Sequence, residues 1–266
     1  MPEASVALLI FAGVLGLLFG SFLNVCIYRM PRDLSVVVPR SFCPECVSRI
    51  GWRDNIPLLS YVLLRGRCRH CGKGIGIRYP LVEASLAVLL VATAWRYGWT
   101  AKGLKWAVFE AIMVALFWTD IEERLLPDEF TLGGTLVGLG FALFVMVPGA
   151  AAELLLPERR PLVRSLVNAG VAALFIAGPV WFIGFAYSHL RKKEGLGLGD
   201  VKLLLLLGVF LGLEDGLLAL LIGAVAGSVL GLIYVRAMRK DVASYELPFG
   251  SFLCAGGALV PLFIKI

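Results

Sequence analysis

The sequence predicts an all-α polytopic membrane protein with about eight transmembrane helices. Of its 266 residues, 59% are hydrophobic and only 17% are charged, and the mean hydropathy is +0.86. A soluble domain of this length rarely has such a composition. Hydrophobic segments long enough to be membrane spans, or nearly so, recur along the chain. They lie at about 5–28, 81–98, 103–119, 131–149, 165–188, 201–213, 216–236 and 247–264.

The first segment, 5–28, is expected to remain as a membrane anchor with the N-terminus outside. It is long enough to span, and its positive charges, Arg29 and Arg32, come after it rather than before it. Lys and Arg concentrate in cytoplasmic loops. With this orientation the loops expected in the cytoplasm hold 17 of the 25 Lys and Arg, at 29–80, 120–130, 189–200 and 236–246. The net charge of +6 therefore follows membrane topology and does not indicate nucleic-acid binding.

The loop at 30–80 contains two C-x-x-C pairs, Cys43 with Cys46 and Cys68 with Cys71. Two residues between thiolates allow each pair to bind one tetrahedral metal, and this pattern is typical of a zinc ribbon. Four cysteines complete the coordination, so the zinc would be structural rather than catalytic. The alternative is two redox-active or free pairs. The loop is thus expected to be a small cytoplasmic zinc-binding domain.

Two aspartates are expected at the cytoplasmic face, at similar depth. Asp120 directly follows segment 103–119, and Asp200 directly precedes segment 201–213. Two carboxylates that meet cannot both ionise easily, so one holds a proton while the other activates water, as in aspartic peptidases. The alternatives are structural: a solvated acid at the membrane edge for Asp120 and a helix N-cap for Asp200. Because a helix N-terminus favours the charged form, Asp200 is expected to be ionised and Asp120 to carry the proton.

Four further residues around the aspartates are candidates for supporting roles. Gly197 and Gly199 precede Asp200 and would let an extended substrate approach the carboxylate closely. Lys202 follows, and is expected either to extend to the interface or to pair with an acid near the site. Asp128 is a candidate cap for the helix that follows it.

The ordered motifs resemble those of the bacterial prepilin peptidases (type IV leader peptidases), membrane aspartic proteases of the GxGD kind. The resemblance runs almost end to end. It rests on residues 20–25 and 29–31, the two Cys pairs, 55–61, 78–83, Asp120 with 126–128, 197–203 and 248–250.

The resemblance implies an enzyme of the bacterial inner membrane, with its active site facing the cytoplasm. Such enzymes remove the basic leader of prepilins and pseudopilins, and Asp120 and Asp200 match their catalytic pair. Asp128 is a matched residue without an assigned role. Many members also N-methylate the new N-terminal residue with S-adenosylmethionine, and the zinc-binding loop accompanies that second activity. The implied partners are these substrates and membrane lipid, with no nucleic acid.

The methyl-donor site is the least defined part of the chain, because no glycine-rich nucleotide turn lies on a strand–helix background. The candidates are Gly76 and Glu83, at the end of the cysteine loop; the alternative is a flexible link into the second span. The expected division is 1–29 for the first helix, 30–80 for the zinc loop and 81–266 for the peptidase domain. Rival functions are a methyltransferase with structural aspartates, a zinc-handling transporter and an assembly scaffold.

Overall fold

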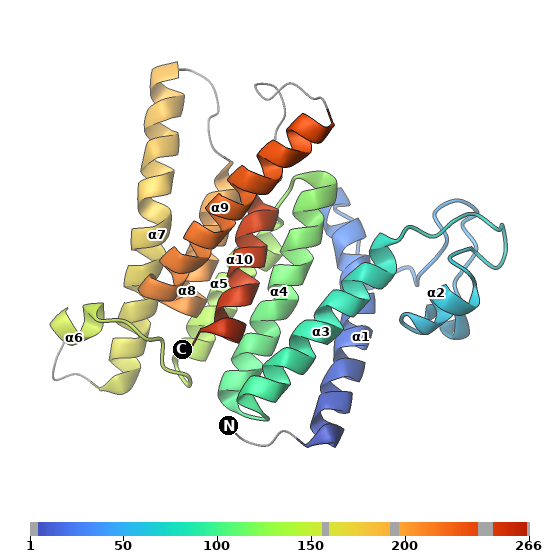
Figure 1. Ribbon diagram of the computed structural model, residues 1–266, viewed down its shortest axis with the longest axis horizontal. Coiled ribbons are helices and arrows are strands. Elements are labelled where there is room, and N and C mark those ends of the chain that lie inside the picture. The colour runs from blue at the N-terminus through green and yellow to red at the C-terminus, as the bar shows by residue number, and fades with distance from the viewer. Residues whose placement is uncertain (1–4, 156–159, 192–196, 239–246, 265–266) are drawn as a thin grey trace. The chain divides into compact units, whose positions relative to one another are not determined.

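The computed structural model describes residues 5–155, 160–191, 197–238 and 247–264, and all the regular secondary structure in these residues is helical (Figure 1). The prediction of an all-α protein is confirmed. Eight longer helices form the frame: α1 (Val6–Arg29), α3 (Arg78–Tyr97), α4 (Ala101–Glu123), α5 (Asp128–Ala142), α7 (Pro161–Arg191), α8 (Leu198–Leu211), α9 (Leu213–Ala237) and α10 (Phe249–Phe263). The shorter elements are α2 (Leu59–Leu63), α6 (Ala151–Leu155) and two 3₁₀ turns at Met30–Arg32 and Trp52–Asn55.

Each of the eight hydrophobic segments overlaps one of the eight longer helices, although the segment expected at 131–149 extends seven residues beyond the end of α5 at Ala142. Four of these, α1, α3, α7 and α9, are long and apolar enough to cross a membrane, so the protein is a multi-pass membrane protein. Helix α10 is apolar but shorter. The count of eight spans remains a prediction. Parts of the loops expected at 189–200 and 236–246 lie outside the described residues.

The chain divides into two compact units, Met1–Trp118 and Thr119–Ile266, which are described separately below. Helix α4 contributes its last residues to the second unit. The finer division at residues 29 and 80 remains a prediction.

In the first unit, α1 and α3 pack side by side through two glycines (Figure 1). A Cβ on Gly16 would lie 2.4 Å from the Cα of Ala87, and one on Gly20 would lie 2.7 Å from the Cα of Glu83. Because only a hydrogen occupies these positions, the two backbones can approach closely, as small residues allow in membrane helices. The contact fixes Glu83 directly against α1.

In the second unit, α8 is the central helix and packs against α5, α7, α9 and α10. It has 14 residues and is therefore only about 21 Å long, too short for a hydrocarbon core of about 30 Å. Nearly all of its side chains from Val201 to Leu211 are buried. A Cβ on Gly208 would lie 2.6 Å from the backbone of Ala173 on α7, so the two helices are in close contact. The short apolar segment is thus a core helix enclosed by protein.

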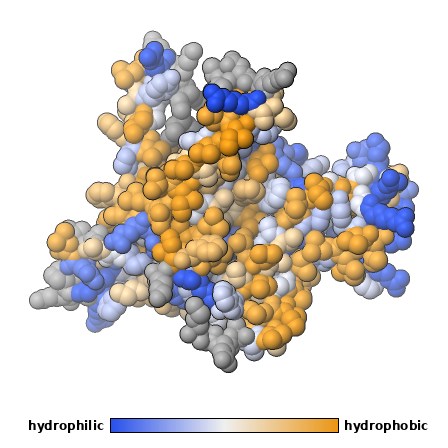
Figure 2. Space-filling model, viewed as in Figure 1, coloured by the Kyte–Doolittle hydropathy of each residue, from blue (hydrophilic) through white to orange (hydrophobic). Residues whose placement is uncertain are grey.

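The hydropathy of the surface differs along the chain (Figure 2). Apolar side chains cover most of the visible face of α9. The segment around α2 shows hydrophilic side chains at its outer edge together with an apolar patch, and Leu59, Val62 and Leu63 of α2 are exposed.

Candidate functional site

Asp120 lies in the last turn of α4, and its side chain is held by the start of α10. It is only 6% exposed. Its Oδ2 accepts two hydrogen bonds from Ser251, one from the backbone N–H at 2.6 Å and one from the hydroxyl at 2.7 Å. Arg124, with φ of 53°, adopts the left-handed conformation just past the end of α4. The chain therefore turns away immediately after placing Asp120.

Leu126 connects the surroundings of the two aspartates. A Cβ on Gly199 would lie 3.3 Å from the Cβ of Leu126, and one on Gly250 would lie 3.0 Å from its Cδ1. The same Cβ on Gly250 would lie 3.1 Å from the carboxyl carbon of Asp120. The glycines before Asp200 and before Ser251 thus allow the starts of α8 and α10 to pack around Leu126.

Asp200 occupies the third position of α8, and the N-cap is Gly197, which makes no side-chain cap. The structural alternative of Asp200 as an N-cap is therefore wrong. No described residue donates a hydrogen bond to its carboxyl group. Its carboxyl group therefore lacks the hydrogen bonds that would stabilise its ionised form.

The two carboxyls differ in how they are stabilised. Both lie just beyond the expected spans 103–119 and 201–213. Burial, and then the negative charge of Asp120, raise the pKa of Asp200 to about 6. Burial also raises the pKa of Asp120, but its hydrogen bonds from Ser251 oppose the rise. Asp120 is therefore the carboxyl better suited to ionise, and Asp200 the one to hold the proton. The sequence alone predicts the opposite, with Asp200 ionised and Asp120 protonated. The two hydrogen bonds from Ser251 stabilise the charge on Asp120 more than the helix dipole stabilises a charge on Asp200.

Lys202 pairs with Asp128 across the start of two helices. Its Nζ donates to Oδ1 of Asp128 at 2.6 Å, joining α8 to the first residue of α5. Asp128 makes no cap, since α5 begins at Asp128 itself and its N-cap is Pro127. The expected capping role is wrong, and the expected pairing of Lys202 with an acid is confirmed.

The four cysteines of the loop form one cluster in the first unit. Their sulfur atoms all lie within 4.8 Å of one another, and Cys43 Sγ is 3.9 Å from Cys71 Sγ. A tetrahedral site with Zn–S bonds of about 2.3 Å needs sulfurs about 3.8 Å apart, so the cluster can hold a metal ion of this kind.

The two halves of the cluster are folded alike. In each, the first Cys donates its N–H to the residue five places on and accepts from the residue four places on. The carbonyl of Cys43 accepts from the N–H of Val47, and the carbonyl of Cys68 accepts from the N–H of Gly72. Val47 and Gly72 have φ angles of 56° and 69°, in the left-handed region. An antiparallel bridge closes each turn, between Phe42 and Arg49 and between Arg67 and Gly74. This repeated turn presents both thiols of a pair to the same point.

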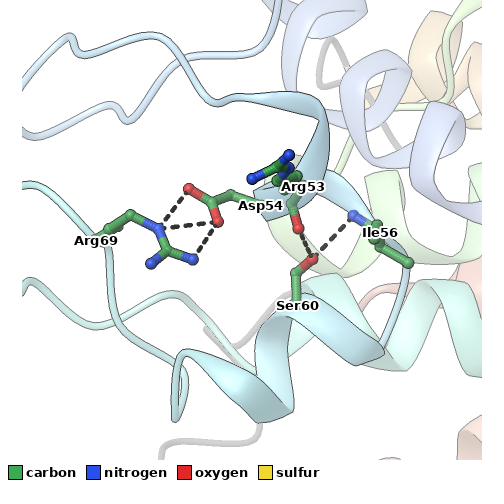
Figure 3. Close-up of polar contacts among 5 residues, drawn as sticks. All are labelled: Arg53, Asp54, Ile56, Ser60 and Arg69. Atoms are coloured by element: carbon green, nitrogen blue, oxygen red, sulfur yellow. Dashed lines mark hydrogen bonds and ion pairs between the residues drawn. The ribbon is translucent and has the colours of Figure 1, made fainter.

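Polar contacts hold the loop around the cluster (Figure 3). Arg69, between the second pair of cysteines, binds both carboxylate oxygens of Asp54 at 2.7–3.0 Å. The hydroxyl of Ser60 accepts from the N–H of Ile56 and donates to the carbonyl of Arg53. These contacts tie the second cysteine pair to the segment before α2.

Gly76 and Glu83, the two candidates for the methyl-donor site, line one cavity in the first unit. Its volume is about 220 Å³. Glu83 is 8% exposed, and its Oε2 accepts a hydrogen bond of 2.8 Å from the N–H of Leu58. Cys43 and Cys68 belong to the same wall.

Reasoning from the sequence missed two residues of the aspartate site, Ser251 and Leu126. Ser251 is 131 positions from Asp120, and a single serine inside an apolar segment has no distinguishing pattern. The only available signal was position, because Ser251 directly follows the motif at 248–250.

Comparison with known proteins covers nearly the whole chain. Residues 14–97 match the Bacterial Peptidase A24 N-terminal domain, and residues 107–232 match the Type IV leader peptidase family. A relative named prepilin leader peptidase/N-methyltransferase, from Xanthomonas campestris, is 35% identical over 94% of this chain and 89% of its own length. Relatives of the same name from Pseudomonas putida and Pseudomonas aeruginosa are 35% and 32% identical, over 95% and 94% of this chain and 89% and 88% of their own lengths.

No solved structure matches the chain. The two matched families, the full-length relatives and the paired aspartates agree with one another. The chain belongs to the type IV leader peptidase family.

Proposed function

We propose that this protein is a membrane aspartic endopeptidase that removes the leader of prepilins or pseudopilins and then N-methylates the new N-terminus. The observation that carries the peptidase half is the coupled pair Asp120 and Asp200, in a chain of this family. Relatives that align over nearly the whole chain carry both activities in their names, which supports the methylating half.

Asp120 and Asp200 act as general base and general acid in this mechanism. Ionised Asp120, held by Ser251, removes a proton from a water molecule as the water attacks the scissile carbonyl. Protonated Asp200 donates its proton to the carbonyl oxygen. As the C–N bond then breaks, Asp120 passes the proton taken from water to the leaving amine, and Asp200 recovers its proton from the hydroxyl that becomes the new carbonyl. No covalent intermediate is needed. Gly197, where a Cβ would meet only Oδ2 of Asp200 at 3.8 Å, leaves room for the extended substrate backbone, whereas Gly199 is packed against Leu126.

The Cys43, Cys46, Cys68 and Cys71 cluster holds structural zinc in this proposal. Four thiolates leave no open position for chemistry, and a loop of this size lacks the core to fold alone.

S-adenosylmethionine, when bound, supplies a methyl group to the amine that cleavage exposes, and leaves as S-adenosylhomocysteine. The amine loses a proton as the new C–N bond forms. Gly76 and Glu83 are the residues proposed to hold this donor. The buried carboxylate of Glu83 provides a negative charge for a cationic ligand.

The protein is proposed to lie in the bacterial inner membrane with its N-terminus outside. The cysteine loop and both aspartates then face the cytoplasm, where the excess of Lys and Arg belongs. A prepilin has a basic leader in water and an apolar helix in lipid, so its scissile bond reaches the interface where the aspartates are expected.

The test uses purified protein in lipid with a prepilin substrate, with and without S-adenosylmethionine. Mass spectrometry of the product is expected to show loss of the leader, and one added methyl group only when the donor is present. Asp120→Asn and Asp200→Asn should each reduce cleavage by at least about 100-fold. Glu122→Gln, an exposed acid on the same helix, is the control and should cleave normally. Normal cleavage by either Asn variant would overturn the assignment.

A further inference from the structure

We propose that the methyl donor binds in the cavity of the first unit between α1, the cysteine loop and the start of α3, with Glu83 and Asn24 as its polar anchors. The inference rests on the proposed methyltransferase activity and gives that activity a site. Neither the fold family nor the names of the relatives locate the donor.

The acids of the cavity wall are not equivalent. Asp54 is paired with Arg69, and Glu45 lies 3.7 Å from the Nζ of Lys73. Glu83, in contrast, receives hydrogen bonds from two neutral groups, the N–H of Leu58 and the hydroxyl of Ser21. A buried carboxylate without a cation is costly, and a positively charged ligand would relieve that cost. The Glu83 side of the cavity is thus suited to a cationic group, while the same wall also carries Arg29, which donates to the carbonyls of Ser35 and Pro39.

Asn24 supplies a second unsatisfied group in the same wall. The side chain is 3% exposed and its Nδ2 donates to the carbonyl of Tyr79 at 3.0 Å. Its Oδ1 is buried and has no hydrogen-bond partner. Buried acceptors are rarely left unpaired, so a donor group from a ligand is expected here.

The remaining lining matches the other parts of the methyl donor. Four aromatic rings line the cavity: Tyr28, Phe42, Tyr61 and Tyr79. Arginine guanidiniums already lie over Tyr28, Phe42 and Tyr79, so among the described residues Tyr61 is the lining ring with no cation over it. Aromatic faces stack on a planar base and attract onium cations such as a sulfonium. S-adenosylmethionine carries a planar adenine with an amino donor, two ribose hydroxyls, an ammonium and a sulfonium. A carboxylate, an unpaired amide oxygen and aromatic faces are the partners these groups require.

A substitution at Gly76 can fill the cavity without removing any side-chain hydrogen bond. A Cβ at Gly76 would have one neighbour, the ring of Tyr79 at 3.9 Å, so a larger side chain there would occupy the cavity. Gly51 is a matched control, because it belongs to the same loop, does not line the cavity and has open space around it. For Glu83 the matched control is Glu110, a fully buried acid of α4 that does not line the cavity.

The experiment measures the dissociation constant of radiolabelled S-adenosylmethionine by equilibrium dialysis with the full-length protein in lipid. Glu83→Gln should raise the constant about tenfold, the effect of losing one charge-assisted contact, and Gly76→Leu should raise it at least as much. Glu110→Gln and Gly51→Leu should bind like the wild type. Ultraviolet crosslinking of the bound donor should label the peptide that contains Tyr61.

The outcomes separate the site from the activity. A wild-type protein that binds and methylates, while both cavity variants bind the donor normally, would overturn the site and leave the proposed function intact. A rise in the KM for prepilin with an unchanged donor constant would assign the cavity to the basic leader and also overturn the inference. A wild-type protein that neither binds the donor nor methylates would overturn both.

Discussion

Ser251 gives Asp120 two hydrogen bonds to a single oxygen, from its backbone N–H and from its hydroxyl. Hydrogen bonds of this kind stabilise a carboxylate more than a carboxylic acid. Asp200 has no comparable donor among the described residues, and the charge of Asp120 further disfavours its ionisation. The difference between two otherwise similar aspartates therefore comes mainly from one serine, and the positive charge of Arg124 acts in the same direction on Asp120.

Changing Ser251 to Ala should alter the pH dependence of cleavage. The variant keeps the backbone N–H but loses the hydroxyl, so the pKa of Asp120 should rise. Activity on the acidic side, where ionised Asp120 is limiting, should fall by about tenfold, the value of one hydrogen bond to a charged group. The alkaline side, where protonated Asp200 is lost as pH rises through about 6, should move little. Rates of leader removal across pH 4–8 or so would measure both limbs.

A uniform loss at every pH would contradict this account and assign Ser251 to folding alone. Ser251→Thr is the conservative control, since it keeps the hydroxyl and should restore the acidic limb.

Gly250 is expected to be intolerant of even one added methyl group. A Cβ there would lie 3.1 Å from the carboxyl carbon of Asp120 and 3.0 Å from Leu126 Cδ1, so Gly250→Ala should displace the catalytic group. We expect kcat to fall by about 10- to 100-fold, because small displacements of reacting groups are costly. Gly133→Ala in α5, where a Cβ meets nothing within 4 Å, is the control. Equal kcat values for the two variants, from initial rates of leader removal, would contradict the packing described at Asp120.

The sequence singles out Asp120 and Asp200 as a candidate pair, because both adjoin apolar segments at edges that the distribution of Lys and Arg places on the same side. Their catalytic role remains a prediction. The sequence could not assign their protonation states. That assignment depends on Ser251, which meets Asp120 only after α10 packs in place.

At the scale of elements, α8 is a short buried helix that carries Asp200, the proposed general acid, in its first turn. Its first turn begins at Leu198 after Gly197, and its remaining length is enclosed by four other helices of the unit. The ion pair between Lys202 and Asp128 joins its start to the start of α5. These contacts hold the backbone of Asp200 in place, whereas its carboxyl group stays without a donor.

Because α1 and α3 are in close contact, replacing a glycine between them by alanine should lower the stability of the protein, whereas such a change in a helix usually raises it. Replacing a helical glycine by alanine normally stabilises a helix by about 0.5–1 kcal/mol. Gly16→Ala should instead destabilise the protein by about 1–3 kcal/mol, since its Cβ would meet the Ala87 backbone at 2.4 Å. Gly170→Ala, on α7 with open space, is the control and should be neutral or stabilising. Thermal unfolding in detergent compares them, and equal melting temperatures would contradict the close packing.

The positions of all eight longer helices could be predicted from hydrophobic segments alone. The role of α8 could not, because its residues are apolar in either setting, membrane or protein core. The N-caps of α5 and α8 could not be predicted either. Aspartate is a common N-cap, but Asp128 is the first residue of α5 and Asp200 is the third residue of α8.

At the scale of the whole molecule, the two activities are assigned to different units. The cysteine cluster and the cavity belong to Met1–Trp118, and the aspartates belong to Thr119–Ile266. The two matched families fall on either side of nearly the same boundary, at residues 14–97 and 107–232. Damage to one site is therefore expected to spare the other chemistry.

Removal of the metal should separate the two activities. Cys43 and Cys68 line both the metal cluster and the cavity, so a chelator should release bound zinc and abolish methylation. Leader removal should persist, since Asp120 and Asp200 need no metal. Elemental analysis before and after chelation, with both products read by mass spectrometry, checks the result. Loss of cleavage in parallel with methylation would contradict the division.

The most direct test of the claim that Asp120 and Asp200 perform the hydrolysis uses the Asp200→Asn variant. The variant is assayed with two substrates, an intact prepilin and the same prepilin already lacking its leader. The account predicts that the variant leaves the intact substrate uncut and methylates the leaderless one at the wild-type rate. Cleavage of the intact substrate at the wild-type rate would contradict the claim that Asp120 and Asp200 perform the hydrolysis.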